Sequence, residues 1–235
     1  MDEPYLREYT EDRELSAWFL LDLSPSVDFG TAEADRQKRT VLVDFVTTLA
    51  RLLTRRGNRV GAVLYGDQVE RTIPAGSGRI QVLRIIDALL RQPRHAAAPF
   101  TDLRPLLDAG HKAIKRRSLV FVISDFISAP GWERSLNLLS QRHEVMAVRL
   151  FDRREVELPD VGALIMEDAE TGEQLYVDTH DKAFRARFQA AAEQRETTLR
   201  TAFKRSGVDV VSLSPDEDLV AAIVRMAALR QRRRR

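Results

Sequence analysis

Three oxygen-bearing side chains follow the first apolar run of the chain, and together they can bind a cation. The run leads into FLLDLSPSVDFG, which places Asp22, Ser24 and Ser26 at every second position. If the run is a strand of an open parallel sheet, these residues leave the sheet at the edge where ligands bind. Carboxylate and hydroxyl oxygens suit Mg²⁺, which takes six oxygen ligands at about 2.0–2.1 Å. The spacing therefore predicts a site for Mg²⁺ or Mn²⁺.

Such a site needs further oxygen ligands, and two later positions can supply them. Asp125 in VFVISDF comes directly after another apolar run, and Thr101 in PFTDL opens a predicted helix. The alternative is structural. Ser24 and Ser26 would then cap a turn, and Asp22 would bond only to backbone groups.

Two more carboxylates lie beside these candidate ligands. Asp28 and Asp102 can add negative potential or hydrogen-bond the ligands from a second layer. An ordinary surface position is an equal alternative for both. Asp102 can also be an acid in the first turn of a helix, where the helix dipole favours it.

Several classes of chemistry find no support in the sequence. Cysteine is absent, and the four histidines show no metal-ligand spacing, which argues against a zinc enzyme. No GxSxG nucleophile motif, Walker A loop or GxGxxG fingerprint is present. We therefore expect neither a serine hydrolase nor a nucleotide-binding protein.

The elements that must position these residues alternate between strand-length apolar runs and segments of helical period. The expected strands are Ala17 to Leu23, Val60 to Tyr65, Leu119 to Ser124, Val145 to Leu150 and Val208 to Leu213. The expected helices are Arg36 to Arg55, Arg79 to Arg91, Leu103 to Lys115, Trp132 to Gln141, Lys182 to Ser206 and Glu217 to Gln231. This alternation predicts a doubly wound α/β fold with a mostly parallel central sheet flanked by helices.

One segment interrupts the alternation. Residues Ala163 to Val177 read ALIMEDAETGEQLYV, two short apolar strands around a turn at Glu170 to Gly172. This pattern predicts a β-hairpin inserted into the α/β fold.

The order DxSxS, loop threonine and strand-end aspartate resembles the metal-ion-dependent adhesion site of von Willebrand factor A-like domains, a Rossmann-type fold. The wider chain is similar to the bacterial family called domain of unknown function fifty-eight. Matching stretches include REYTEDRELSAWFLLDLSPSVDFG, RRGNRVGAVLYGD, TDL, RRSLVFVISDF, RHEVMAVRLFDRREVELPDVG and EDAETGE. The family usually carries an upstream segment with a GDD…R…DW motif, so we expect an N-terminally shortened member.

The resemblance implies roles for the candidate residues. The hydroxyls of Ser24, Ser26 and Thr101 would contact the metal, and Asp22 and Asp125 would act directly or through water. One coordination position would stay open for a carboxylate from a partner protein, so we expect a binding module and not an enzyme. Genes of the family are found beside MoxR-type AAA+ ATPases, which implies an adaptor in the assembly or activation of protein complexes.

Charge and hydropathy set the remaining expectations. The net charge of the 235 residues falls from +2 to −3 when the five arginines among the last six residues are left out, so the body is not basic. We expect a charged lead-in over residues 1–15, a von Willebrand factor A-like domain over 16–229 and an Arg-rich tail over 230–235. No membrane span or secretory leader is predicted, which favours a cytoplasmic protein.

Two alternatives remain open. A metal beside carboxylates can hydrolyse phosphoesters, although the sequence offers no evident second metal site, catalytic lysine or general base. The Arg-rich tail can bind nucleic acid or an anionic surface, although no aromatic interleaving or groove-reading helix accompanies it, and we expect no specific nucleic-acid partner.

Overall fold

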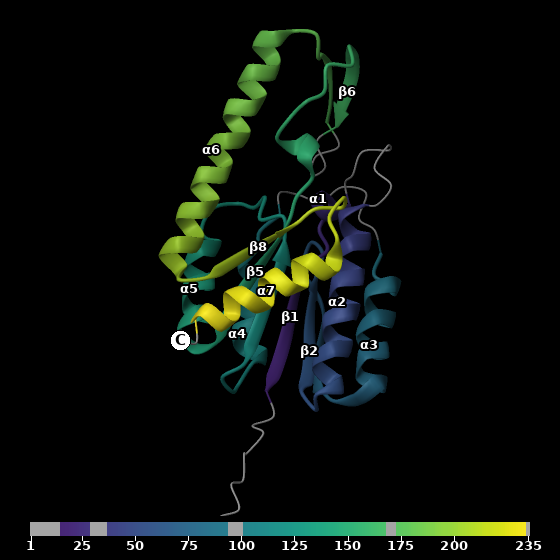
Figure 1. Ribbon diagram of the computed structural model, residues 1–235, viewed down its shortest axis with the longest axis vertical. Helices are drawn as coiled ribbons and strands as arrows, with labels where there is room; N and C mark the ends of the chain where they lie inside the picture. The colour runs from purple at the N-terminus through teal and green to yellow at the C-terminus, as the bar shows by residue number, and fades with distance from the viewer. Residues whose placement is uncertain (1–14, 29–36, 94–100, 168–172, 234–235) are drawn as a thin grey trace, which may run out of the picture.

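The central feature of the fold is a six-stranded sheet with strand order β3-β2-β1-β4-β5-β8. The computed structural model describes residues 15–28, 37–93, 101–167 and 173–233 (Figure 1). Five strands are parallel, and β3 pairs antiparallel with β2 at one edge. The strands are β1 (Ser16–Asp22), β2 (Arg59–Tyr65), β3 (Val69–Gly76), β4 (Leu119–Ser124), β5 (Glu144–Leu150) and β8 (Asp209–Leu213).

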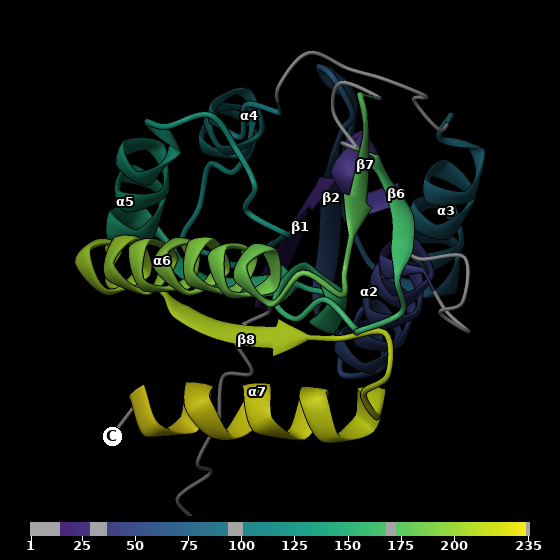
Figure 2. The same ribbon diagram turned by 90° about the horizontal axis from the view of Figure 1, so that it is seen from above.

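Helices cover both faces of this sheet, as Figure 2 shows. One face carries α2 (Lys38–Arg55), α3 (Gly78–Arg91) and α7 (Leu219–Arg233). The other face carries α4 (Arg104–Ala113), α5 (Trp132–Arg142) and α6 (Lys182–Ser206). The predicted doubly wound arrangement is confirmed. Among the helices of the described residues, none combines the length and apolarity that crossing a bilayer requires.

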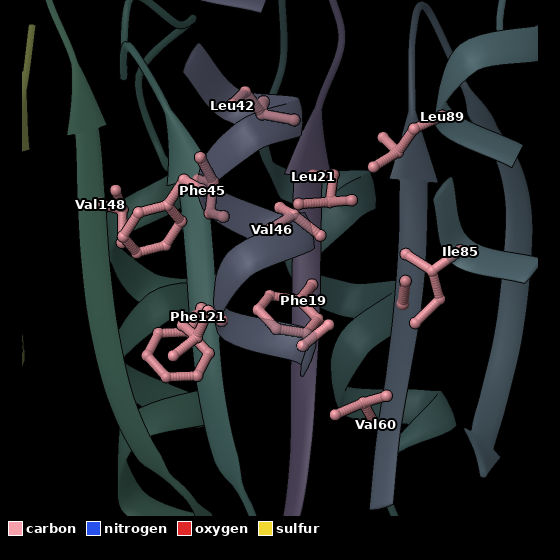
Figure 3. Close-up of a cluster of buried hydrophobic side chains, with 14 of the residues drawn as sticks. Phe19, Leu21, Leu42, Phe45, Val46, Val60, Ile85, Leu89, Phe121 and Val148 are labelled. Atoms are coloured by element: carbon pink, nitrogen blue, oxygen red, sulfur yellow. The ribbon is translucent and has the colours of Figure 1, made fainter. Parts of the chain in front are cut away.

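Strand β1 lies between these two helical layers and contributes to both cores. Phe19 and Leu21 face α2 and α3, while Trp18 and Leu20 face α4 and α5. In the first core the rings of Phe19 and Phe121 stack with centroids 5.5 Å apart (Figure 3). Burial on both faces explains why the strand is continuously apolar. The packing of both faces also holds the carboxyl end of β1 in place.

The predicted strands and helices are confirmed, with ends that differ from the expected ones by at most two residues. Strand β3 was not predicted. Its sequence, VERTIPAG, is exposed at most positions, and Pro74 interrupts its hydrogen bonding. Proline is tolerated there because β3 is an edge strand.

The predicted hairpin insertion is also confirmed. It consists of β6 (Ala163–Glu167) and β7 (Gln174–Asp178), and its predicted turn falls within residues 168–172, outside the described residues. The buried Thr179 closes the base, because its backbone N–H and its hydroxyl both donate to the Gly162 carbonyl at 2.8 Å. The hairpin rises above the edge at which β1 ends (Figures 1 and 2).

Gly110 of α4 lets this helix approach β1 closely. A Cβ atom at Gly110 would lie 2.6 Å from Cδ1 of Leu20, closer than real Cβ contacts allow. We predict that Gly110→Val lowers the free energy of unfolding by about 2 kcal/mol, because the core next to β1 is overpacked. Urea unfolding measures this loss.

Leu20, the residue that a side chain at position 110 would meet, provides the control. In a Leu20→Ala background the same substitution has space to enter, so the double variant should lose less stability than the sum of the two single losses. Strictly additive losses would show that this contact does not limit the side chain at position 110.

Candidate functional site

Two carboxylates lie side by side at the carboxyl ends of neighbouring strands. Asp22 is the last residue of β1, and Asp125 follows the last residue of β4. The two strands are paired in parallel, with Leu21 opposite Ile123, so both side chains emerge at the same edge. Asp22 is 0% exposed and Asp125 is 1% exposed.

The segment after β1 folds back on Asp22 and brings two hydroxyls with it. The backbone N–H of Ser24 donates to Asp22 Oδ1 at 3.0 Å, and the short helix α1 (Pro25–Asp28) follows. This turn places Ser24 Oγ and Ser26 Oγ 3.1 Å apart, both buried. The structure therefore brings Asp22, Ser24 and Ser26 together, as their spacing predicted.

The segment after β4 is held by the side chains of its own residues. Asp125 Oδ1 accepts from the backbone N–H of Ile127 at 3.0 Å, and Ser124 Oγ accepts from that of Phe126 at 2.8 Å. Phe126 has a φ of 59°, a left-handed conformation that bulky residues rarely adopt. Its ring is fixed against Phe203 and Trp132, with centroids 4.8 and 5.4 Å away. Aromatic packing thus stabilises the strained turn that directly follows Asp125.

Thr101 is placed by backbone contacts with the same segment. Its carbonyl accepts from the N–H of Ala129 at 2.8 Å, and the N–H of Leu103 donates to Ser128 Oγ at 3.0 Å. The Thr101 side chain is 4% exposed. The loop before α4 is therefore attached to the loop that carries Asp125.

The two carboxylates expected in a second layer differ in what the structure describes. Asp28 ends α1, and its side chain is outside the described part. The Asp102 carboxylate binds the Arg104 guanidinium at 2.6 Å and accepts from the Arg104 N–H at 2.9 Å. These Arg104 hydrogen bonds lower the pKa of Asp102. Asp102 lies two residues before the first residue of α4, so the expectation of an acid in the first turn of that helix is wrong.

Three residues that the sequence did not single out complete the site. The Ser124 hydroxyl donates to Asp22 Oδ2 at 2.6 Å. The Lys38 ammonium lies 3.3 Å from Asp125 Oδ2 and 2.6 Å from Glu155 Oε1. Ser124 was detectable as the neighbour of Asp125 in VFVISDF. Lys38 and Glu155 had no local signal, since 87 residues separate Lys38 from Asp125 and 117 separate it from Glu155.

The electrostatics of the site are dominated by the buried carboxylates. Burial, and then the charge of Asp125, raise the pKa of Asp22 from its ordinary 3.8 to about 7, against the hydrogen bonds from Ser124 and Ser24 that lower it. Within the described residues, no group of three or more acidic or histidine side chains is arranged for a metal. The candidate donors named from the sequence are two carboxylates and three hydroxyls, and hard oxygens of this kind suit Mg²⁺ or Mn²⁺ better than a soft metal.

The mostly parallel sheet, its antiparallel edge strand and its two helical layers form a von Willebrand factor A-like fold. The chain belongs to the family described as protein of unknown function DUF58, which it matches over residues 1–198.

Known relatives and structures agree with this placement. The uncharacterized protein Rv1480 of Mycobacterium tuberculosis is 34% identical over 229 residues, which cover 97% of this chain and 71% of the relative. The conserved hypothetical protein BatB of Bacteroides thetaiotaomicron superposes with a TM-score of 0.56 at 11% identity, covering 94% of this chain and all (100%) of that one. An aerotolerance-related membrane protein of Bacteroides fragilis gives a TM-score of 0.55 at 12% identity, covering 89% and 96%. At these identities the two structures show a shared fold.

Asp22→Asn tests the cost of the buried charge. Because the pKa of Asp22 is raised to about 7 in the folded chain, the folded state holds a proton that the unfolded chain releases above 3.8. The resulting stabilisation is full below pH 3.8 and is lost as the pH rises through 7. Without divalent cations at pH 8, we predict that Asp22→Asn is more stable than wild type by about 1 kcal/mol or more.

Thermal unfolding in EDTA between pH 5 and 8 measures this difference. The advantage of the Asn variant should grow across the range, because only wild type acquires the buried charge. A variant that is less stable at every pH, with a profile parallel to wild type, would contradict the assignment of a costly carboxylate at position 22.

Proposed function

We propose that this chain is a metal-dependent protein-interaction module, whose divalent cation is Mg²⁺ or Mn²⁺. The proposed ligands, direct or through water, are Asp22, Ser24, Ser26, Thr101 and Asp125. The observation that carries the proposal is the burial of two carboxylates, 0% and 1% exposed, next to a pair of buried serine hydroxyls 3.1 Å apart. Buried like charges are unfavourable unless a cation balances them.

The composition of the ligand set supports binding of an acidic partner. Three of the five proposed ligands are neutral hydroxyls, so they hold a cation without cancelling its charge. A divalent cation there would supply a position that an incoming carboxylate can complete. The chain's own residues orient that position through the two strand-end turns.

The hairpin supports a protein partner over a small molecule. It rises above the same sheet edge (Figures 1 and 2). Ile165 and Tyr176 are paired across β6 and β7, and they are 61% and 73% exposed. Exposed apolar side chains beside the candidate site can be buried against another protein, which favours a protein partner.

The nature of the partner is proposed from the family resemblance. A MoxR-type AAA+ ATPase is the proposed partner, with the chain acting as an adaptor in the assembly or activation of protein complexes in the cytoplasm. The acidic group that completes the metal would come either from the ATPase or from the complex on which it acts.

The structure adds one feature to the hydrolase alternative, a lysine beside the candidate site. The sequence offered no evident catalytic lysine, yet the Lys38 ammonium lies 3.3 Å from Asp125 Oδ2. It is also paired with Glu155, and the described residues offer no carboxylates for a second metal at this site. Phosphatase activity that requires Mg²⁺ and is absent in Asp22→Asn would favour this alternative.

Loss of nucleic-acid binding on removal of Arg232 to Arg235 would favour the tail alternative.

Ser24→Ala tests the proposed function. Removing one hydroxyl ligand should weaken Mg²⁺ binding about tenfold or more, measured by calorimetry. Capture of partners from a native lysate, read by mass spectrometry, should then depend on Mg²⁺ in wild type and be lost in the variant. EDTA should abolish the same captures.

Ser118→Ala is the matched control, because Ser118 is also buried but precedes β4 at the opposite edge of the sheet. It should bind Mg²⁺ and partners as wild type does. Identical captures by all three proteins, with and without Mg²⁺, would contradict a metal-dependent interaction.

A further inference from the structure

Lys38 occupies a position that is unfavourable for a lysine on two grounds. It is the first residue of α2, and its side chain is only 2% exposed. Burial penalises an ammonium group, and the amino end of a helix repels a cation. Among the described residues, two carboxylates that it contacts, those of Asp125 and Glu155, explain its placement.

Lys38 contacts the Asp125 oxygen that does not accept the Ile127 N–H. Asp125 Oδ1 already accepts the N–H of Ile127 at 3.0 Å. Oδ2 is 3.3 Å from the Lys38 ammonium. A divalent cation that uses Asp125 Oδ2, directly or through water, therefore meets a positive charge at the same oxygen.

Glu155 offers the ammonium a second acceptor that does not depend on Asp125. It ends the short helix η1 (Arg153–Glu155), which follows β5 and leads toward the hairpin. Its Oε2 accepts from the N–H of Asp152 at 3.4 Å, and Asp152 in turn accepts from the N–H of Arg154 at 2.9 Å. This capping box holds Glu155 in place with Oε1 turned to Lys38.

Lys38 carries its positive charge in this environment. Burial lowers the pKa of the ammonium, but the carboxylates of Asp125 and Glu155 outweigh it, so that the pKa is raised overall. The group is thus a fixed cation beside the candidate ligands.

We propose that the Lys38 ammonium is a tethered cation that competes with the divalent ion for Asp125 Oδ2, and that it gives up this contact and keeps the one with Glu155 when the ion binds. This inference rests on the proposed metal site and adds its regulation. It makes metal affinity depend on η1, the segment that joins the sheet to the hairpin. A partner that moves η1 would thereby change how tightly the metal is held.

Four proteins test the competition by calorimetric titration with Mg²⁺ and with Mn²⁺: wild type, Lys38→Met, Glu155→Gln and the double variant. Lys38→Met should bind each ion about tenfold more tightly or better, because the competing charge is gone. Glu155→Gln should bind more weakly than wild type, because the ammonium loses its alternative acceptor.

The double variant is decisive because it has the same net charge as wild type. Competition predicts that it binds more tightly than wild type and that Glu155→Gln has less effect once Lys38 is absent. If the double variant instead binds as wild type does while Lys38→Met binds more tightly, the effect is one of net charge and the competition is refuted.

Two matched controls exclude general effects of charge. Lys112→Met removes an exposed lysine from α4, and Glu157→Gln removes an exposed carboxylate two positions after Glu155. Both should titrate as wild type does. If Lys38→Met fails to fold, as judged by circular dichroism, the weaker binding of Glu155→Gln relative to Glu157→Gln carries the test.

The outcomes separate this inference from the proposed function. Metal binding by wild type with no change in any variant refutes the competition and leaves the metal site standing. Binding by the double variant but not by wild type supports the competition and refutes a metal-dependent wild-type module. Absence of binding in all four proteins refutes both.

Discussion

The carboxyl groups of Asp22 and Asp125 are buried at the same edge of the sheet, because β1 and β4 are neighbours in its middle and helices cover both faces. The remaining features of the site respond to this constraint. Ser24 and Ser124 donate hydrogen bonds to Asp22, and Ile127 and Lys38 do so to Asp125. These contacts stabilise negative charge in part, yet the pKa of Asp22 stays near 7. The buried carboxylates are thus maintained at a cost in stability, which the two apolar cores on either side of the sheet offset.

The same constraint explains the local geometry after β4. A left-handed Phe126 is strained, and such strain persists only where the surroundings impose it. Trp132 at the start of α5 and Phe203 near the end of α6 supply those surroundings. The helical layer behind the sheet therefore helps to orient Asp125 through apolar packing of aromatic rings.

Most of the fold and part of the site could be predicted from the sequence. Strands buried on both faces, such as Leu119 to Ser124, are continuously apolar and are recognised directly. Strand β3 has one buried residue, Ile73, and no apolar run, so it was missed. Asp22, Ser24 and Ser26 share a local spacing, whereas Lys38 meets Asp125 only through the tertiary fold. A lysine at the start of a helix has no pattern that distinguishes it from a surface lysine.

The most direct test of the metal site is the anomalous diffraction of Mn²⁺ in crystals of this protein. The account predicts one strong peak within coordination distance of the Ser24 and Ser26 hydroxyls, adjacent to Asp22 and Asp125. We also predict that the Lys38 ammonium then contacts Glu155 and no longer Asp125. A crystal grown with excess Mn²⁺ that shows no peak at this sheet edge, with Lys38 still bound to Asp125, would contradict the account.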